Sequence, residues 1–226
     1  MTALVQIDVT DGWERARSLD VSRTAFVVAC VGRAVATHPE VHAYRDWLGR
    51  LVVHRRVNVT TMVEVETPQG WFPLAHSLRD AHTRSIDDLS SELRSVRAGA
   101  PSGPAGRGVV GWGAVAARIP GVVTATYRLS RRSARMRERI GTVAVSSVGM
   151  MMGGNGVAIG VPALASLSVF VGGADERPWV VDGEVRIRRI LDVSVTIDHR
   201  VVDGAPAARF GATLRTLLED PDLLEW

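Results

Sequence analysis

The stretch ILDVSVTIDHRVVDGAPAARF, residues 190–210, joins an alternating apolar run to a segment with helical periodicity. Alternate residues of the run share one face of a predicted strand: Val193, Val195 and Ile197. His199 falls where this alternation ends, and Asp203 and Gly204 open the predicted final helix. Because a strand that leads directly into a helix holds the residues between them rigidly, this junction is the candidate functional site.

Length and composition predict one globular domain over residues 1–226. Hydrophobic residues make up 46% of the chain and charged residues 23%. No repeat or low-complexity tract divides it, and no apolar run approaches the roughly 18 uncharged residues of a membrane span. The N-terminus lacks the charged and apolar regions of a secretory signal. We therefore expect a cytoplasmic protein with no membrane partner.

The basic residues are all arginine. The 27 Lys+Arg residues include no lysine, and the net charge is only +3, so the high pI reflects the pKa of guanidinium and predicts no nucleic-acid partner. One segment, YRLSRRSARMRERI (127–140), concentrates the charge. Its apolar spacing favours an amphipathic helix with a solvated basic side, whereas an anion site at Arg131 and Arg132 is the alternative.

The single cysteine, Cys30, excludes an intramolecular disulfide. It lies in the apolar stretch AFVVACVGRAV, which favours buried packing over nucleophilic chemistry.

Periodicity along the chain predicts an α+β fold. Strands are predicted at 3–10, at two places between Gly49 and Val65, and at 141–149, 163–173, 179–189 and 190–197, with a hairpin turn at Asp182-Gly183. Helices are predicted at 22–38, with Ser22 as N-cap, at 83–99 and at 205–220. In the second of these, Ser85 and Asp88 have capping-box spacing, and the predicted apolar stripe is Ile86, Leu89, Leu93 and Val96. Residues 98–140 form an atypical insert, rich first in Gly and Ala and then in Arg.

A lone histidine is more often structural or solvated than catalytic, and for a functional His199 three chemistries compete. A zinc site is disfavoured because no second His or Cys follows at ligand spacing, although Asp198 and Asp203 are near. A serine hydrolase is disfavoured because no Gly-x-Ser-x-Gly elbow occurs. A general base acting on the substrate's own nucleophile needs neither feature.

DHRVVDGAPAARF (198–210) and LLEDPDLL (217–224) resemble the C-terminal signature of the acyltransferase components of 2-oxo-acid dehydrogenase complexes. Chloramphenicol acetyltransferases share the His-x-x-x-Asp-Gly pattern more loosely. HPEVHAYRD (38–46) is similar to a Pro-Glu-Val-Asn segment of the family, with His42 in place of Asn. GTVAVSSVGM (141–150) is similar to the strand that carries the family's oxyanion donor.

The resemblance implies a chloramphenicol acetyltransferase-like fold, with a central mixed sheet flanked by helices. It implies an acyltransferase that moves an acyl group between coenzyme A and a dihydrolipoyl-type thiol or another small acceptor, with no metal. His199 would be the general base, and Ser146 would donate to the oxyanion, with Ser147 as the second choice. Asp203 would be structural and fix the loop through a salt bridge. Its partner is left open, with Arg200 and Arg209 as candidates, and a carboxyl without a partner would have to be protonated or hydrated.

The remaining expected contacts with coenzyme A come from Ser147, Gly149 and Gly204, the last of which would also permit a tight helix entry. The family's assembly implies a homotrimer with the active site between subunits. Trp226 is expected to be exposed, where it could contribute to contacts between trimers.

No segment of the given sequence resembles the family's lipoyl domains, its subunit-binding domain or its usual first helix, and the sequence does not decide whether Met1 is the natural start. The acceptor is therefore expected on a separate lipoylated protein, with no lipoyl attachment here. The alternative is a non-catalytic trimeric scaffold, which would assemble but ignore coenzyme A.

Overall fold

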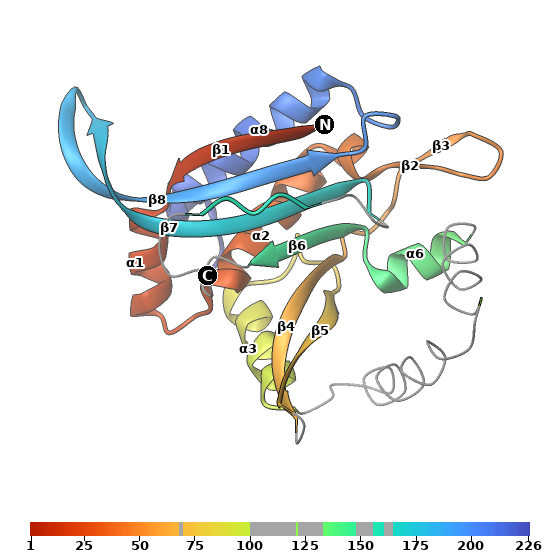
Figure 1. The fold of residues 1–226 in the computed structure, drawn as a ribbon, viewed down its shortest axis with the longest axis horizontal. Helices are drawn as coiled ribbons and strands as arrows, with labels where there is room; N and C mark the ends of the chain where they lie inside the picture. Colours follow the sequence, from red (N-terminus) through yellow and green to blue (C-terminus); the bar gives the residue numbers. More distant parts are fainter. Residues whose placement is uncertain (68–69, 100–120, 122–132, 148–155, 161–164) are drawn as a thin grey trace.

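The computed structural model describes residues 1–67, 70–99, 121, 133–147, 156–160 and 165–226. Its helices and strands follow one another along the chain as shown in Figure 1: β1 (Thr2–Asp8), α1 (Thr10–Ser18), α2 (Arg23–Thr37), η1 (Pro39–His42), β2 (Tyr44–Arg45), β3 (Leu51–Val52), β4 (Val59–Thr67), β5 (Gly70–Leu78), α3 (Ile86–Arg97), α6 (Ala134–Ile140), β6 (Val143–Ser147), β7 (Leu167–Val181), β8 (Glu184–Ile197), α8 (Gly204–Glu219) and η2 (Pro221–Leu223). Most of the predicted insert, 98–140, lies outside the described residues.

The main sheet is mixed, as predicted. Its described strands lie in the order β1-β8-β7-β6-β4-β5. β6 runs parallel to both of its neighbours, whereas the other pairs are antiparallel. β2 and β3 form a separate hairpin that projects beside the end of the sheet (Figure 1).

The long β7–β8 hairpin corrects one prediction. The three strands expected at 163–173, 179–189 and 190–197 are instead parts of two long strands, β7 and β8. The predicted turn is confirmed, since Asp182 and Gly183 have φ of 53° and 81°, as a type I′ turn requires. The strands continue across a register shift between Val171 and Ala174 and across charged residues that are largely exposed, so hydrophobic alternation did not reveal their full length.

The helices bury one face of the sheet. α2 is apolar on most of its circumference and packs against α3 and α8. The predicted apolar stripe of α3 is buried, and Ser85 Oγ accepts a hydrogen bond from the Asp88 backbone N–H at 3.2 Å, as the capping pattern predicts. α8 buries Phe210, Leu214 and Leu218 in the same core.

Two elements, α1 and β5, were not predicted. α1 carries a glycine and mostly polar residues. The guanidinium of Arg188, on β8, bonds to Asp11 of α1 (2.7 Å) and to Asp8 at the end of β1 (2.6 Å). β5 is mostly exposed, so its sequence lacks a clear apolar face, but it pairs with β4 over its whole length. α1 thus depends on a contact with a segment distant in sequence, whereas β5 depends on pairing with the strand that precedes it.

The environment of Trp226 differs from the prediction of an exposed side chain. Its ring is partly buried and stacks on Phe26 with a centroid distance of 5.4 Å. Its indole Nε1–H donates to the Pro221 carbonyl oxygen at 2.8 Å. The apolar C-terminal side chain therefore closes the core of its own chain.

Cys30 is buried in α2, which confirms the packing interpretation. Its Sγ lies 3.4 Å from the Leu217 carbonyl oxygen of α8, and burial raises the pKa of the thiol.

The predicted basic helix is confirmed over Ala134–Ile140, where the Arg137 guanidinium lies 4.4 Å from the centre of the Tyr44 ring. Arg131 and Arg132 lie outside the described residues.

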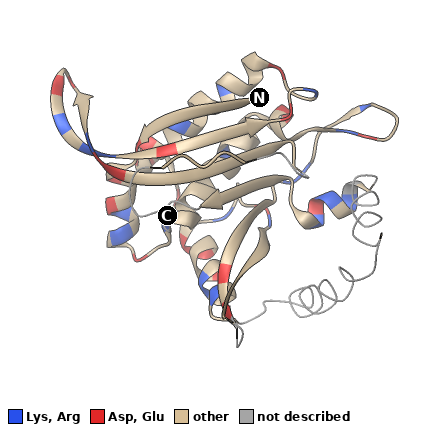
Figure 2. Cartoon of the chain, in the orientation of Figure 1, with Lys and Arg blue, Asp and Glu red and all other residues tan. Residues whose placement is uncertain are grey.

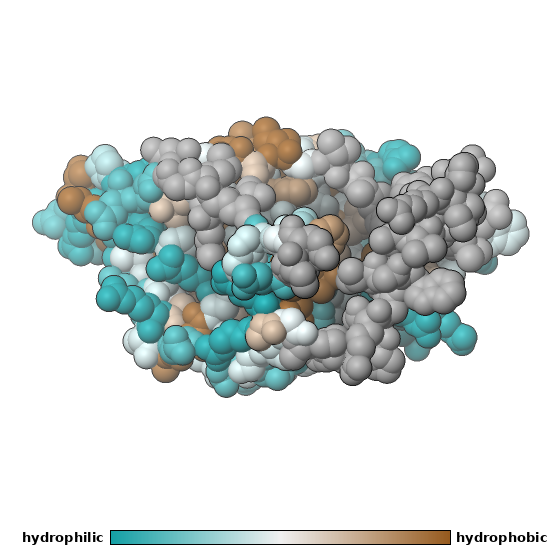
Figure 3. Space-filling view, turned by 60° about the horizontal axis from the view of Figure 1, so that its bottom comes forward, coloured by the Kyte–Doolittle hydropathy of each residue, from teal (hydrophilic) through white to brown (hydrophobic). Residues whose placement is uncertain are grey.

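Charged and apolar side chains are unevenly placed on the surface. Charge gathers on the helices and on the β7–β8 hairpin, whereas β6 carries none (Figure 2). Apolar patches are separated by hydrophilic residues, and one lies at the end of the molecule that holds the β7–β8 hairpin (Figure 3). Among the described helices, none has the length and apolar character needed to cross a membrane.

Candidate active site

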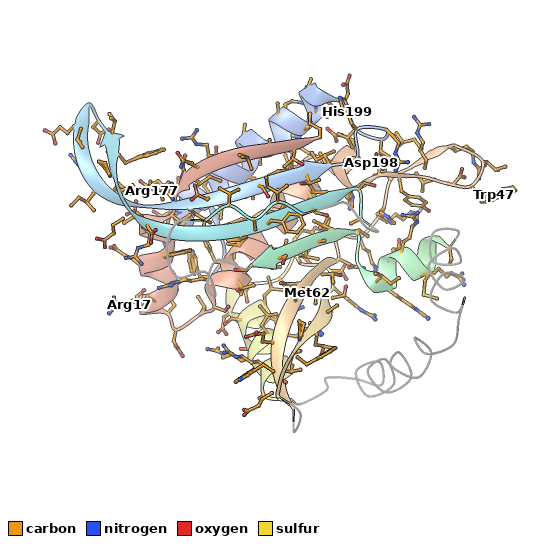
Figure 4. The ribbon with its side chains drawn as sticks, viewed as in Figure 1. Arg17, Trp47, Met62, Arg177, Asp198 and His199 are labelled. Atoms are coloured by element: carbon orange, nitrogen blue, oxygen red, sulfur yellow. The ribbon has the colours of Figure 1, made fainter. Side chains whose placement is uncertain are left out.

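The loop between β8 and α8 is fixed by hydrogen bonds around Asp198. The Asp198 backbone N–H donates to the Ser166 carbonyl oxygen at 2.8 Å, and the Asp198 carbonyl oxygen accepts from the Val201 N–H at 2.9 Å. Asp198 and His199 lie together at the end of β8, near the base of the hairpin that ends in Trp47 (Figure 4). A further bond, from Arg45 Nε to the Arg200 carbonyl oxygen at 3.0 Å, joins this hairpin to the loop.

The His199 ring has one nitrogen engaged and one available. Nδ1 lies 3.0 Å from the Val202 carbonyl oxygen. Because a carbonyl oxygen can only accept, Nδ1 carries the proton in the neutral ring and Nε2 carries the free lone pair. The side chain is 53% exposed. The geometry therefore presents a neutral imidazole that can accept a proton at Nε2.

Asp203 departs from its predicted role in a buried salt bridge. Its side chain is 89% exposed, and its Oδ1 lies 4.0 Å from His199 Nδ1. Arg200 instead forms a bidentate ion pair with Asp198, at 2.9 and 2.7 Å, which holds the pKa of the Asp198 carboxyl below its usual value. No ion pair joins Asp203 to Arg209 among the described residues.

The role that the structure gives to Asp203 is N-cap of α8. Its Oδ1 accepts from the Gly204 N–H at 2.7 Å. An exposed carboxylate needs no buried counter-ion, so solvent and the helix start take the place of the predicted arginine.

Gly204 also differs from expectation. A Cβ built at this position meets no atom within 4 Å, and its φ is not in the left-handed region. The described chain therefore does not require glycine for the helix entry, and any close approach at Gly204 would have to come from a ligand or another subunit.

Ser146 and Ser147 are the last residues of β6 and lie on opposite faces of the sheet. Ser147 shares the helix-covered face with Val145, and both line a pocket against α2. Ser146 faces the other side, on which Leu4 and Met62 are 58% and 47% exposed. Gly149 lies outside the described residues.

Within one chain, the structure does not bring Ser146 and His199 together. Ser146 pairs with Phe170, which pairs with Ser194, and β8 continues three residues beyond Ser194 before it ends. The end of β8 is thus about 10 Å from Ser146 along the strands and about 10 Å across two strand spacings, and His199 lies two residues beyond that end. One chain presents the two halves of the predicted site at different places.

A buried histidine pair lies near this loop, and no local periodicity predicts the contact between the two rings. The His42 and His54 rings have centroids 5.6 Å apart, and His42 Nδ1 lies 3.2 Å from Thr142 Oγ1. Burial lowers the pKa of each histidine to about 4. His42 occupies the position at which the resembled family has asparagine, and this substitution was the one available signal of an unusual environment.

Among the described residues, no group of three or more His, Cys, Asp or Glu side chains is arranged to hold a metal ion.

The comparison with protein families decides the relationship. Residues 115–225 match the model described as 2-oxoacid dehydrogenases acyltransferase (catalytic domain). This part of the chain belongs to that family. The match includes the β8–α8 loop and confirms the resemblance stated from its sequence.

Relatives of this acyltransferase family extend the likeness over most of the chain. The dihydrolipoyllysine-residue acetyltransferase component of the pyruvate dehydrogenase complex of Acholeplasma laidlawii is 24% identical over 217 residues. The alignment covers 94% of this chain but 33% of the relative, so the chain spans about a third of that protein's length.

Solved structures confirm the predicted fold. The dihydrolipoamide acetyltransferase of Azotobacter vinelandii superposes with a TM-score of 0.69 at 19% identity, covering 99% of this chain and 82% of that one. A chloramphenicol acetyltransferase superposes with a TM-score of 0.61 at 15% identity, covering 96% and 87%. The Azotobacter structure belongs to an investigation of one serine, one histidine and one asparagine in catalysis, the asparagine four positions after the histidine and the serine 52 before it.

Proposed function

We propose that this chain is a catalytic domain that transfers an acyl group between coenzyme A and a dihydrolipoyl-type thiol, with His199 as general base. Coenzyme A is the acyl-carrying substrate, and the acceptor is the lipoyl group of a separate protein in the cytoplasm. Support comes from the family match, from the names of the relatives and from the geometry at His199.

The observation that carries the proposal is the bond between His199 Nδ1 and the Val202 carbonyl oxygen. It leaves the Nε2 lone pair free on a half-exposed ring at the end of a rigid strand. A free thiol has a pKa near about 8.5 and is mostly protonated at neutral pH, so a base accelerates its attack.

In the proposed reaction, His199 Nε2 removes the proton of the attacking thiol while the sulfur of that thiol bonds to the thioester carbonyl carbon. The carbonyl π electrons move to oxygen and give a tetrahedral oxyanion. When the oxyanion collapses, the carbon–sulfur bond to the other thiol breaks, and that sulfur takes the proton from Nε2–H. The imidazole returns to its starting state, and no acyl-enzyme forms.

Ser146 is proposed to donate its hydroxyl to the oxyanion. The Azotobacter spacing of 52 counts back from His199 to Ser147, and Ser146 lies one position further. The sheet face distinguishes the two, because Ser147 points toward the helices of its own chain, whereas Ser146 points to the face without helices. A neighbouring subunit can therefore reach Ser146 more directly.

The separation of Ser146 from His199 supports a site shared between subunits of a homotrimer. His199 of one subunit would meet Ser146 of the next, and Gly204, beside His199, has open space for a substrate or that subunit. Contacts of Ser147 and Gly149 with coenzyme A remain predictions. Asp203 is proposed to act by capping α8 and thereby positioning the His199 loop.

The test is transfer from acetyl-coenzyme A to free dihydrolipoamide, with the full chain and with His199→Ala. Loss of the base is expected to lower turnover by about 10²–10⁴-fold. His38→Ala is the matched control, because this half-buried histidine bonds to Thr213 and lies outside the site. Ser146→Ala is expected to cost about 10²–10³-fold in turnover, and Ser147→Ala less.

Light scattering shows whether each variant keeps its oligomeric mass. Normal assembly with neither coenzyme A binding nor turnover would contradict the proposal and favour the scaffold alternative. A monomeric protein with full turnover would reject the shared site but retain the chemistry.

A further inference from the structure

A pocket of about 110 Å³ lies between the sheet and the first two helices. α1, which carries Arg17, lies at the end of the molecule away from His199 (Figure 4). Aliphatic side chains of α2, β6, β7 and β8 form part of the wall: Val27, Val145, Val171 and Leu191. This wall offers hydrocarbon contact to a short chain.

The polar groups of the pocket are rich in donors. Trp13 Nε1 is buried and has no hydrogen-bond partner. An indole N–H can only donate, so its satisfaction requires an acceptor that enters from outside the described chain. Ser147 and Thr24 add two hydroxyl groups, and none of the described residues that line the pocket is Asp or Glu.

Positive charge collects at the same place. The Arg23 guanidinium lies 4.5 Å from the centre of the Trp13 ring, and no ion pair is found for Arg23 within the described part of the chain. Arg189, which also lines the pocket, pairs at 3.1 Å with Glu176, whose side chain is 67% exposed. Burial lowers the pKa of Arg23, and the charges of Arg189 and Arg17 act in the same direction. A bound anion would relieve this repulsion.

The start of α2 adds to this field. Arg23 and Thr24 are its first two residues, and the side chain of its N-cap, Ser22, makes no capping bond. The free backbone N–H groups and the positive end of the helix dipole also favour an anion here.

We propose that this pocket binds the carboxylate of a short aliphatic acid. One carboxylate oxygen would accept from Trp13 Nε1–H, the Arg23 guanidinium would balance its charge, and the hydrocarbon chain would cover the aliphatic wall. An inorganic anion would accept hydrogen bonds from the donors but would make no hydrocarbon contact with the aliphatic wall. The site does not depend on the proposed acyl transfer, and its test requires no turnover.

The experiment follows the tryptophan indole N–H signals by ¹H–¹⁵N NMR of the full chain. The Trp13 signal is assigned as the one that disappears in Trp13→Phe. Addition of sodium butyrate is expected to shift it, while the signals of exposed Trp47 and Trp71 stay in place. Affinity is expected to rise from acetate to butyrate by about fourfold for each methylene group buried.

Arg23→Gln is expected to weaken butyrate binding roughly tenfold or more, since it removes a charge-assisted contact. Arg186→Gln is the matched control, because Arg186 is an exposed arginine on the β7–β8 hairpin paired with Glu184. This variant is expected to bind as the parent does. In the ¹H spectrum of each variant, an unchanged dispersion of the aliphatic methyl signals would show that the fold is intact.

The proposal fails if butyrate leaves the Trp13 signal unmoved, or if Arg23→Gln binds it as well as the parent. If inorganic phosphate binds as tightly as butyrate and chain length has no effect, a carboxylic-acid site is also rejected. Binding of butyryl-coenzyme A but not of butyrate would overturn the requirement for a free carboxylate.

Discussion

His199 and the pair His42–His54 place the same side chain in opposite surroundings. His199 is half-exposed at the end of a strand, and a backbone carbonyl fixes its tautomer. His42 and His54 are 2% and 9% exposed, and desolvation keeps them neutral by lowering the pKa of each to about 4. A histidine that must exchange protons needs access to substrate, whereas a histidine that supports the fold is protected from protons. The difference predicts that one governs turnover and the other two govern stability.

The largest expected effect is a contrast between two alanine variants, one of which should lose turnover and the other stability. His199→Ala should lose about 10²–10⁴-fold in turnover with little change in the free energy of unfolding. His42→Ala should lose about 2–4 kcal/mol of that free energy, because it leaves a cavity and removes the contact between His42 Nδ1 and Thr142 Oγ1, with turnover per folded molecule nearly unchanged. Initial rates and urea unfolding measure the two quantities. Equal loss of turnover in both variants would break the comparison.

Acid should destabilise the protein through the buried pair. Between pH 6.5 and about 4, these histidines are protonated in the unfolded chain but remain neutral in the folded chain. The free energy of unfolding therefore falls as pH falls through this range. Each histidine contributes up to about 3 kcal/mol by pH 4. Urea midpoints at pH 7.5 and 4.5 measure the loss.

His54→Phe sharpens this result, because it keeps a ring beside Tyr44 and removes one titrating group. The pH-dependent loss of stability should then fall to about half. An unchanged pH dependence in this variant would mean that other groups cause the acid sensitivity.

A smaller effect is expected where the buried pair meets the sheet. Thr142 Oγ1 contacts His42 Nδ1 at 3.2 Å and the Asn58 backbone N–H at 3.1 Å. Thr142→Val keeps the shape but removes these bonds, and should lower the free energy of unfolding by about 1–3 kcal/mol. Thr216→Val, at an exposed helical threonine, is the control and should be nearly neutral. Equal melting temperatures of the two variants would contradict the assigned role of Thr142.

The smallest effect is expected beside His199. Asp203→Ala removes the N-cap of α8 and should cost about 1 kcal/mol of stability. Asp203→Asn retains a capping oxygen and should be close to the parent. Urea unfolding compares the two. A loss of several kcal/mol in Asp203→Asn would instead indicate a buried ionic role.

Sequence reasoning succeeded where one periodicity decides the structure. α2, α3 and α8 bury their predicted apolar residues, and β8 ends where alternation stops before His199. It failed for α1 and β5, which have weak apolar patterns and depend on Arg188 and on pairing with β4. The same limit applies to strand length, since β7 and β8 run on through charged, exposed residues.

The site was predictable in its residues but not in its geometry. The motif indicated His199 and Asp203, yet the exposure of Asp203 and the pairing of Arg200 with Asp198 depend on how the loop folds. The separation of Ser146 from His199 follows from strand register, which no local pattern encodes. The contact between His42 and His54 joins segments that turn back on each other through η1 and the β2–β3 hairpin.

The burial of Cys30 has a chemical consequence for a protein proposed to work among thiols and thioesters. An accessible thiolate would exchange with an acyl thioester, and the protein would acylate itself in each encounter with its substrate. The chain has one cysteine, and the structure places its sulfur inside α2, out of solvent, with a pKa raised by burial. The protein is therefore expected to be inert toward the reagents of its own chemistry, and thiol-directed probes in an assay should report on substrate thiols while the fold stays closed.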